Sequence, residues 1–198
     1  MIVLKARYCL LLAAVTFITG CGKQERSEAV QFAKVLTGEK NNFASANTIE
    51  KDLVSNARVW CVGIIANGAG RGVELDQNAA VAAQLAKYTV AVSSELSQVR
   101  QAIDRQPLQE AYPREVRDEL TTQLTKRQRL LQDMRASLEQ AAAQFLEFRH
   151  SKTYVGDTYP GGVEKMATLL RTYHAPEDAV SDALTALQAK YGLSASEI

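Results

Sequence analysis

The sequence predicts an all-α fold, a helical bundle built around a long antiparallel αα-hairpin with coiled-coil-like packing. Three observations predict it. Apolar residues recur at helical spacing through almost every segment, glycine and proline gather at only a few places, and the longest uninterrupted segment carries a heptad pattern. The length is that of one ordinary domain, so we expect a single helical domain over 28–198.

Glycine and proline clusters divide this domain at 38–42, 63–72, 107–113, 156–162 and 174–176. Before the second break, Asn47 and Glu50 have the spacing of a capping box. The apolar residues that follow recur at steps of four and three, as on one helix face: Ile49, Leu53, Ala57, Trp60 and Ile64. The β-branched run 59–65 also fits a short buried strand, but the upstream periodicity favours a helix. The segment 24–36 is weakly amphipathic.

Two long helices, about 77–105 and 114–150, form the expected hairpin. In the first, one apolar stripe runs until Pro107 stops the helix: Val81, Leu85, Tyr88, Val92, Leu96, Val99 and Ile103. In the second, Pro113 suits a first-turn position, and the core positions keep heptad spacing: Leu120, Leu124, Arg127, Leu131, Met134, Leu138, Ala141, Phe145 and Phe148. A short proline-bounded turn joins the helices, so we expect them to pack antiparallel.

Arg127 is the one charged residue in the heptad seam. It is a candidate interaction residue that faces a protein partner. The simpler alternative is a long side chain that snorkels to the surface from a register-setting position.

Two shorter helices complete the expected bundle. The first carries Val163, Met166, Leu170 and Tyr173 on one face. The second is opened by Pro176, carries Val180, Leu184, Leu187 and Tyr191, and is ended by Gly192. We expect both to cover one end of the hairpin.

The first 22 residues have the layout of an export signal. Lys5 and Arg7 precede an uncharged, mostly apolar stretch from Tyr8 to Ile18, which is shorter than the ~20 residues of a membrane-spanning helix. The stretch leads into Ile18-Thr19-Gly20-Cys21, a run that resembles the lipobox of bacterial lipoproteins. The resemblance covers residues 1–22 only. The alternatives are an ordinary secretory signal that contains a cysteine and a short uncleaved anchor.

The lipobox resemblance implies a lipid anchor. It implies that residues 1–20 are a cleaved signal peptide, that Cys21 carries lipid including palmitate, and that 21–27 form the anchor and a short tether. Two or three acyl chains hold a protein on a membrane effectively permanently. Since Gly22 and not Asp follows the cysteine, the resemblance favours the periplasmic face of the outer membrane. The inner membrane is the alternative if this sorting inference fails. A tether of about six residues reaches about 20 Å at ~3.5 Å per residue, so the domain should stay near the lipid.

Charge content argues against one class of partner, and cysteine content argues against an intramolecular disulfide. The chain has 23 Lys+Arg and 22 Asp+Glu, and loss of Lys5 and Arg7 with the signal leaves a net charge near −1. Such a balance argues against a nucleic-acid partner. Because Cys9 leaves with the signal and Cys21 is acylated, Cys61 has no cysteine to pair with inside the chain. We expect a buried structural thiol, with intermolecular pairing or a reactive role as the alternative.

No catalytic, cofactor or metal motif is recognisable, so we predict a protein that is not an enzyme. The chain has no G-x-S-x-G or H-E-x-x-H motif, and its two histidines, His150 and His174, lie near the ends of different segments. The glycines of 63–72 and Arg71 could form an anion-binding nest. Their spacing matches neither a Walker loop nor a dinucleotide fingerprint, and a flexible loop is the simpler interpretation.

A second loop combines aromatic, acidic and glycine residues and is typical of binding surfaces. Its Tyr154, Asp157 and Tyr159 are candidate interaction residues, with an ordinary turn as the alternative.

The lipid tether, the long hairpin and the lack of convergent polar chemistry favour a non-enzymatic adaptor, pilotin-like chaperone or scaffold of an envelope or secretion machine. Its expected partner is a protein. The alternatives are an immunity- or inhibitor-type lipoprotein and, less favoured, a periplasmic small-ligand binder or enzyme. An adaptor should expose an apolar patch on the hairpin or last helix, and an inhibitor a strongly charged concavity. An enzyme should have a pocket that joins the glycine loop or Asp157 to His150 or His174.

Overall fold

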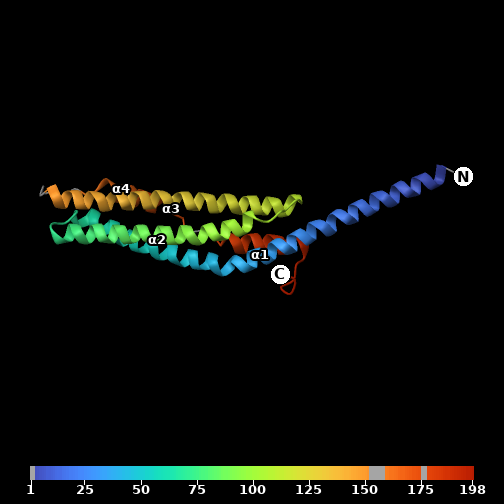
Figure 1. Ribbon diagram of the computed structural model, residues 1–198, viewed down its shortest axis with the longest axis horizontal. Coiled ribbons are helices and arrows are strands. Elements are labelled where there is room, and N and C mark those ends of the chain that lie inside the picture. The colour runs from blue at the N-terminus through green and yellow to red at the C-terminus, as the bar shows by residue number, and fades with distance from the viewer. Residues whose placement is uncertain (1–2, 152–158, 175–177) are drawn as a thin grey trace. The chain divides into compact units, whose positions relative to one another are not determined.

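The computed structural model describes the backbone of residues 3–151, 159–174 and 178–198, and the side chains within these ranges from Gly22 onward. These residues form five α-helices and no strand (Figure 1). The helices are α1 (Val3–Asn67), α2 (Val73–Asp104), α3 (Ala111–Ser151), α4 (Gly161–Thr172) and α5 (Ala179–Tyr191). The predicted all-α bundle is confirmed. Among the described residues, no helix combines the length and apolar character needed to cross a membrane.

The chain forms two compact units. Unit 1 comprises Met1–Lys40, Gln101–Thr121 and Asp178–Ile198, and unit 2 comprises Asn41–Arg100 and Thr122–Glu177. Each unit therefore brings together segments that are far apart in the sequence. The limits predicted from the sequence, 1–20, 21–27 and 28–198, stay predictions.

Helix α1 is longer than the sequence predicted. The predicted break at 38–42 is absent, and because α1 continues through Asn47, this residue does not cap a new helix. One glycine in a helix costs about 1 kcal/mol relative to alanine. Burying one large apolar side chain contributes about 1.5–3 kcal/mol, and α1 buries Phe32, Leu36 and Phe43 around Gly38. Burial therefore outweighs the local break signal. At 59–65 the helix is confirmed and the strand alternative is wrong.

Helices α2 and α3 form the predicted antiparallel hairpin, side by side in Figure 1. In unit 2, Arg149 Nε lies 3.3 Å from Asp76 Oδ2, and Gln128 Nε2 donates to Ser97 Oγ at 2.9 Å. In unit 1, Thr121 Oγ1 donates to Asp104 Oδ1 at 2.9 Å. Residue numbers fall along α3 as they rise along α2, which is the register of an antiparallel pair.

The α3 seam is buried as predicted, apart from Phe148, which is half-buried, and Arg127, described below. In the predicted α2 stripe, Leu85 and the residues from Val92 onward are buried, so these positions are confirmed. Val81 and Tyr88 are 41% and 38% exposed, and the buried positions nearby are small: Ala79, Ala82, Ala86 and Thr89. Small side chains let helix backbones approach closely. This half of α2 therefore packs through its small residues together with Leu75 and Leu85, while Val81 and Tyr88 are turned outward.

Unit 1 fixes the ends of α3 and α5 with side-chain and glycine caps. Glu28 Oε2, on α1, accepts hydrogen bonds from the backbone N–H groups of Gln109 and Glu110, both at 2.9 Å, directly before α3 begins. A carboxylate at this place complements the positive end of a helix. Asp178 caps α5 through Ser181 N–H at 3.1 Å, and Gly192, with φ 60° and ψ 40°, ends it as predicted.

Candidate interaction site

A buried polar cluster in unit 2 holds Arg127. Arg127 Nε donates to Glu50 Oε2 at 2.5 Å, and the Arg127 Nη2 atom lies 2.5 Å from the same oxygen. The Tyr173 hydroxyl donates to Glu50 Oε1 at 2.8 Å. The side chains of Glu50 and Arg127 are only 1% and 9% exposed. One carboxylate thus joins α1, α3 and the residue that follows α4.

An aromatic ring and a tyrosine hydroxyl complete the surroundings of the Glu50–Arg127 pair. The guanidinium carbon of Arg127 lies 5.2 Å from the centre of the Phe43 ring, within cation–π range. Burial, and then the Glu50 carboxylate, raise the pKa of Tyr173 above its usual value, so its hydroxyl keeps the proton that it donates.

Arg127 does not snorkel to the surface as its simpler interpretation predicted. Its guanidinium is turned into unit 2, where Glu50 neutralises it. The sequence pattern predicts Glu50 as a capping residue and not as the partner of Arg127. A signal was present, because Phe43, Ala46, Glu50, Leu53 and Ala57 follow one helical stripe in which Glu50 takes a core position. The structure thus places Arg127 in a buried ion pair, and its predicted role in binding a partner stays a prediction.

The second predicted group of interaction residues is only partly described. Tyr154 and Asp157 lie outside the described residues. Tyr159 is half-buried and precedes Pro160, whose carbonyl oxygen accepts from Val163 N–H at 2.9 Å at the start of α4. Of these three candidates the structure therefore describes Tyr159, which lies just before the start of α4.

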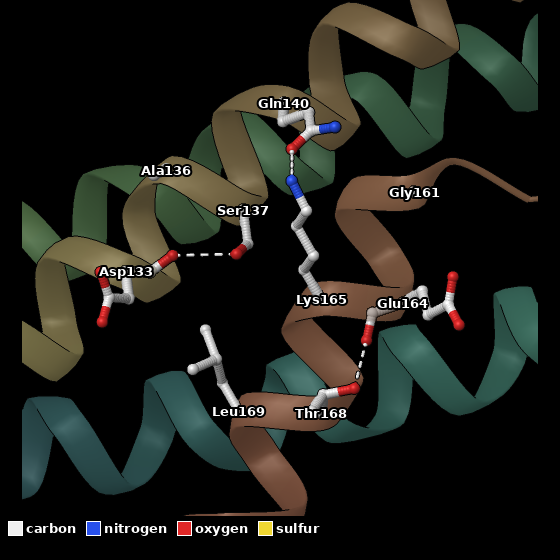
Figure 2. A pocket seen from close by; sticks show the side chains of 9 residues that line it. All are labelled: Asp133, Ala136, Ser137, Gln140, Gly161, Glu164, Lys165, Thr168 and Leu169. Atoms are coloured by element: carbon white, nitrogen blue, oxygen red, sulfur yellow. Dashed lines mark hydrogen bonds between the residues drawn. The ribbon is translucent and has the colours of Figure 1, made fainter.

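A surface hollow of about 610 Å³ lies between α3 and α4 in unit 2 (Figure 2). Its polar groups bond largely to the protein itself: Lys165 Nζ donates to Gln140 Oε1 at 2.9 Å, and Ser137 Oγ to the Asp133 carbonyl at 2.9 Å. The carboxylates of Asp133 and Glu164 lie on opposite sides of it. This hollow has mixed charge and does not include the glycine loop, His150 or His174. It resembles neither the concavity expected of an inhibitor nor the pocket expected of an enzyme.

The glycine loop is occupied by the protein's own carboxylate. Gly68, Gly70 and Gly72 have φ of 80°, 83° and 52°, a region that glycine adopts without strain. The backbone N–H of Arg71 donates to Glu74 Oε2 at 2.9 Å. Glu74 thus takes a donor that the nest hypothesis assigned to an external anion. Among the described residues, no group of His, Cys, Asp and Glu is arranged to hold a metal ion.

The large hydrophobic side chains that are exposed among the described residues all belong to unit 2. Val59 and Val62 on α1 are 74% and 66% exposed, and Val73 at the start of α2 is 66% exposed. Ile65 on α1 and Leu146 near the end of α3 are each 44% exposed. We call these five residues the apolar end of unit 2, because the end of α1, the start of α2 and the end of α3 meet there (Figure 1). Exposed apolar side chains were predicted on the hairpin or last helix. Val73 and Leu146 do lie on the hairpin helices α2 and α3, whereas Val59, Val62 and Ile65 lie on α1.

Comparison of the chain with protein-family models, curated proteins and solved structures finds no match.

Proposed function

We propose that the protein is a lipid-anchored helical lipoprotein on the periplasmic face of the outer membrane. It acts without catalysis, as an adaptor, pilotin-like chaperone or scaffold of an envelope or secretion machine. The observation that carries the proposal is the run Ile18-Thr19-Gly20-Cys21 after a short apolar segment with a basic start. Lipid on Cys21 accounts for membrane attachment without a spanning helix.

The apolar end of unit 2 supports a role in binding a protein. Val59 and Val62 lie about one turn apart on α1, and both expose more than half of their surface. Soluble monomers rarely keep large contiguous apolar patches in water, and such side chains commonly mark protein contacts. An amphipathic helix of a partner is a fitting counterpart for a helical face of this kind.

Site-specific photocrosslinking in living cells tests this role. A photoreactive residue replaces Val62 in one variant and Gln132, an exposed polar residue of α3 in the same unit, in the control. We expect the Val62 variant to capture one defined envelope protein and the Gln132 variant to capture none. Capture of no protein at Val62, or the same products from both variants, would contradict a partner-binding role for the apolar end.

A further inference from the structure

The segment that follows α5 is tied to the part of α1 next to Cys21. In unit 1, Arg26 Nη2 donates to Glu197 Oε1 at 2.6 Å. Only five positions separate Arg26 from Cys21 along the chain. Two segments at opposite ends of the sequence therefore lie at one end of unit 1.

The residues around Glu197 form a fixed turn. Glu197 Oε2 accepts hydrogen bonds from the backbone N–H of Ser194 at 2.9 Å and from its hydroxyl at 3.0 Å. The pKa of Glu197 is lowered to about 2, chiefly by the hydrogen bond from the Ser194 backbone and further by the Arg26 guanidinium and the Ser194 hydroxyl. The carboxylate therefore remains ionised near neutral pH. Leu193 is buried, and its N–H donates to the Gln188 carbonyl at 3.2 Å. The segment 193–198 is thus held to the rest of unit 1 by the Arg26–Glu197 pair, the buried Leu193 side chain and the Leu193–Gln188 backbone bond.

The short path from Arg26 to Cys21 limits how far this turn can lie from the anchor. As helix, five residues rise about 8 Å. Fully extended, they reach about 18 Å. At either distance between Arg26 and Cys21, the 194–197 turn lies at the end of unit 1 nearest the lipidated residue.

The surface of unit 1 argues against a flat orientation on the membrane. A helix that lies in the membrane interface needs an exposed apolar face. Among the described side chains of unit 1, none of the large hydrophobic residues is exposed. The exposed positions of α1 in this unit are polar or small: Gly22, Lys23, Gln24, Arg26, Ser27, Gln31, Lys34, Thr37, Gly38 and Lys40.

We propose that unit 1 stands end-on on the lipid surface. Its contact with the headgroup layer is made by Lys23, Arg26 and the segment 194–198, and α1 leads away from the bilayer toward Lys40. The proposal rests on lipidation of Cys21. Polar and charged side chains at this end suit headgroups, and the acyl chains on Cys21 supply the hydrophobic attachment.

Fluorescence quenching by lipids tests the orientation. The lipidated protein is reconstituted into phosphatidylethanolamine and phosphatidylglycerol vesicles that contain a headgroup spin-labelled phospholipid. An environment-sensitive fluorophore is attached to Ala195→Cys or to Lys40→Cys, both exposed positions of unit 1. Lys40 lies about 28 Å along α1 from Cys21, by helical rise. Cys61 is buried and Cys21 is acylated, so neither takes the label.

We expect quenching at position 195 to exceed quenching at position 40 several-fold. Equal quenching at the two positions, or stronger quenching at position 40, overturns the end-on orientation. Only protein that floats with the vesicles and carries lipid on Cys21 by intact mass is measured. Absence of that lipid refutes the proposed function and this orientation together, whereas lipidated protein with the wrong quenching pattern refutes the orientation alone.

Discussion

The carboxylate of Glu50 joins two partners inside unit 2. Its two oxygens accept from Arg127 and Tyr173, so the buried charge is both neutralised and hydrogen-bonded. A buried ion pair is weak evidence for net stability, because taking two charges out of water is costly. Removing one partner is different, since it leaves the other charge buried and alone.

Replacing either Glu50 or Arg127 by leucine should lower the free energy of unfolding by about 3–5 kcal/mol. The double replacement should cost less than the sum of the two single changes. Arg135→Leu on the same helix is the control, because the Arg135–Glu139 pair is about half exposed and should be worth under about 1 kcal/mol. Urea unfolding followed by the fluorescence of Trp60, the single tryptophan of the chain, measures all four variants. Single changes no more costly than Arg135→Leu would contradict the cluster's role.

The Cys61 thiol should be inert in the folded protein. It is buried, as the sequence predicted, and burial raises its pKa from 9.0 to about 12. Near neutral pH this leaves far less thiolate than in the unfolded chain. A thiol reagent at pH 8 should therefore label Cys61 far more slowly in native protein than in urea. Comparable rates in both, with Lys40→Cys as the exposed reference, would show that the thiol is accessible.

The raised pKa of Cys61 also makes the stability of the protein depend on pH. A pKa that is raised by folding means that the neutral thiol is favoured in the folded state. Its contribution to stability is fully present below pH 9.0 and is lost as the pH rises toward about 12. Cys61→Ala should therefore weaken the fall in stability over this alkaline range, relative to the unchanged protein, in urea unfolding curves.

Helix α4 packs closely on α3 at Gly162. A Cβ atom on Gly162 would lie 2.4 Å from Ala141 N and 2.5 Å from the Ser137 carbonyl oxygen, which are backbone atoms that cannot move aside cheaply. The Gly162 N–H also donates to Gln144 Oε1 at 3.1 Å. The approach of the two helices therefore depends on the absence of a side chain at position 162.

Gly162→Ala should destabilise the protein by about 1–3 kcal/mol, the usual cost of overpacking. Gly161→Ala is a matched control, because its Cβ would meet nothing closer than 3.9 Å. It should be neutral or slightly stabilising. Thermal unfolding and hydrogen exchange of α4 amides compare the two. Equal stability of both variants would mean that α4 is not packed closely on α3.

Proline and glycine made the long helices predictable to within a few residues. Pro107 lies in the turn between α2 and α3, Pro113 lies in the first turn of α3, and the glycines after Asn67 end α1. Local signals were less reliable where tertiary burial overrode them. Gly38 lies inside α1, and the α2 stripe was misassigned at Val81 and Tyr88 because apolar size, on which the assignment relied, does not reveal packing through alanine. The Glu50–Arg127 pair was missed since a charged residue in a core stripe has meaning only once its partner helix is known.

The two units differ in the hydrophobic side chains that they expose. The exposed large hydrophobic side chains of the described residues are confined to unit 2, whereas unit 1 contains the chain next to Cys21. This distribution fits a protein in which one unit is attached to lipid and the other binds a partner. In the proposed adaptor, unit 1 is attached to the membrane and unit 2 binds the partner. The sequence did not predict this division of roles.

Gly22→Asp should move the protein from the outer to the inner membrane, because an acidic residue after the lipidated cysteine commonly signals retention there. Density-gradient fractions of the two membranes, probed for the protein, measure the change. Gly22→Ala is the control and should stay with the outer membrane. If Gly22→Asp also remained there, the sorting inference from Gly22 would be wrong, although lipidation itself would stand.

Lipid on Cys21 is the proposed anchor of this helical protein. Labelling of cells with radioactive palmitate, followed by purification and intact mass, tests it most directly in the unchanged protein, in Cys21→Ser and in Cys61→Ala. We predict a labelled protein that begins at Cys21, unchanged labelling in Cys61→Ala, and an unlabelled, unprocessed precursor in Cys21→Ser. Normal labelling of Cys21→Ser, or an unchanged protein that carries no lipid, would contradict the account.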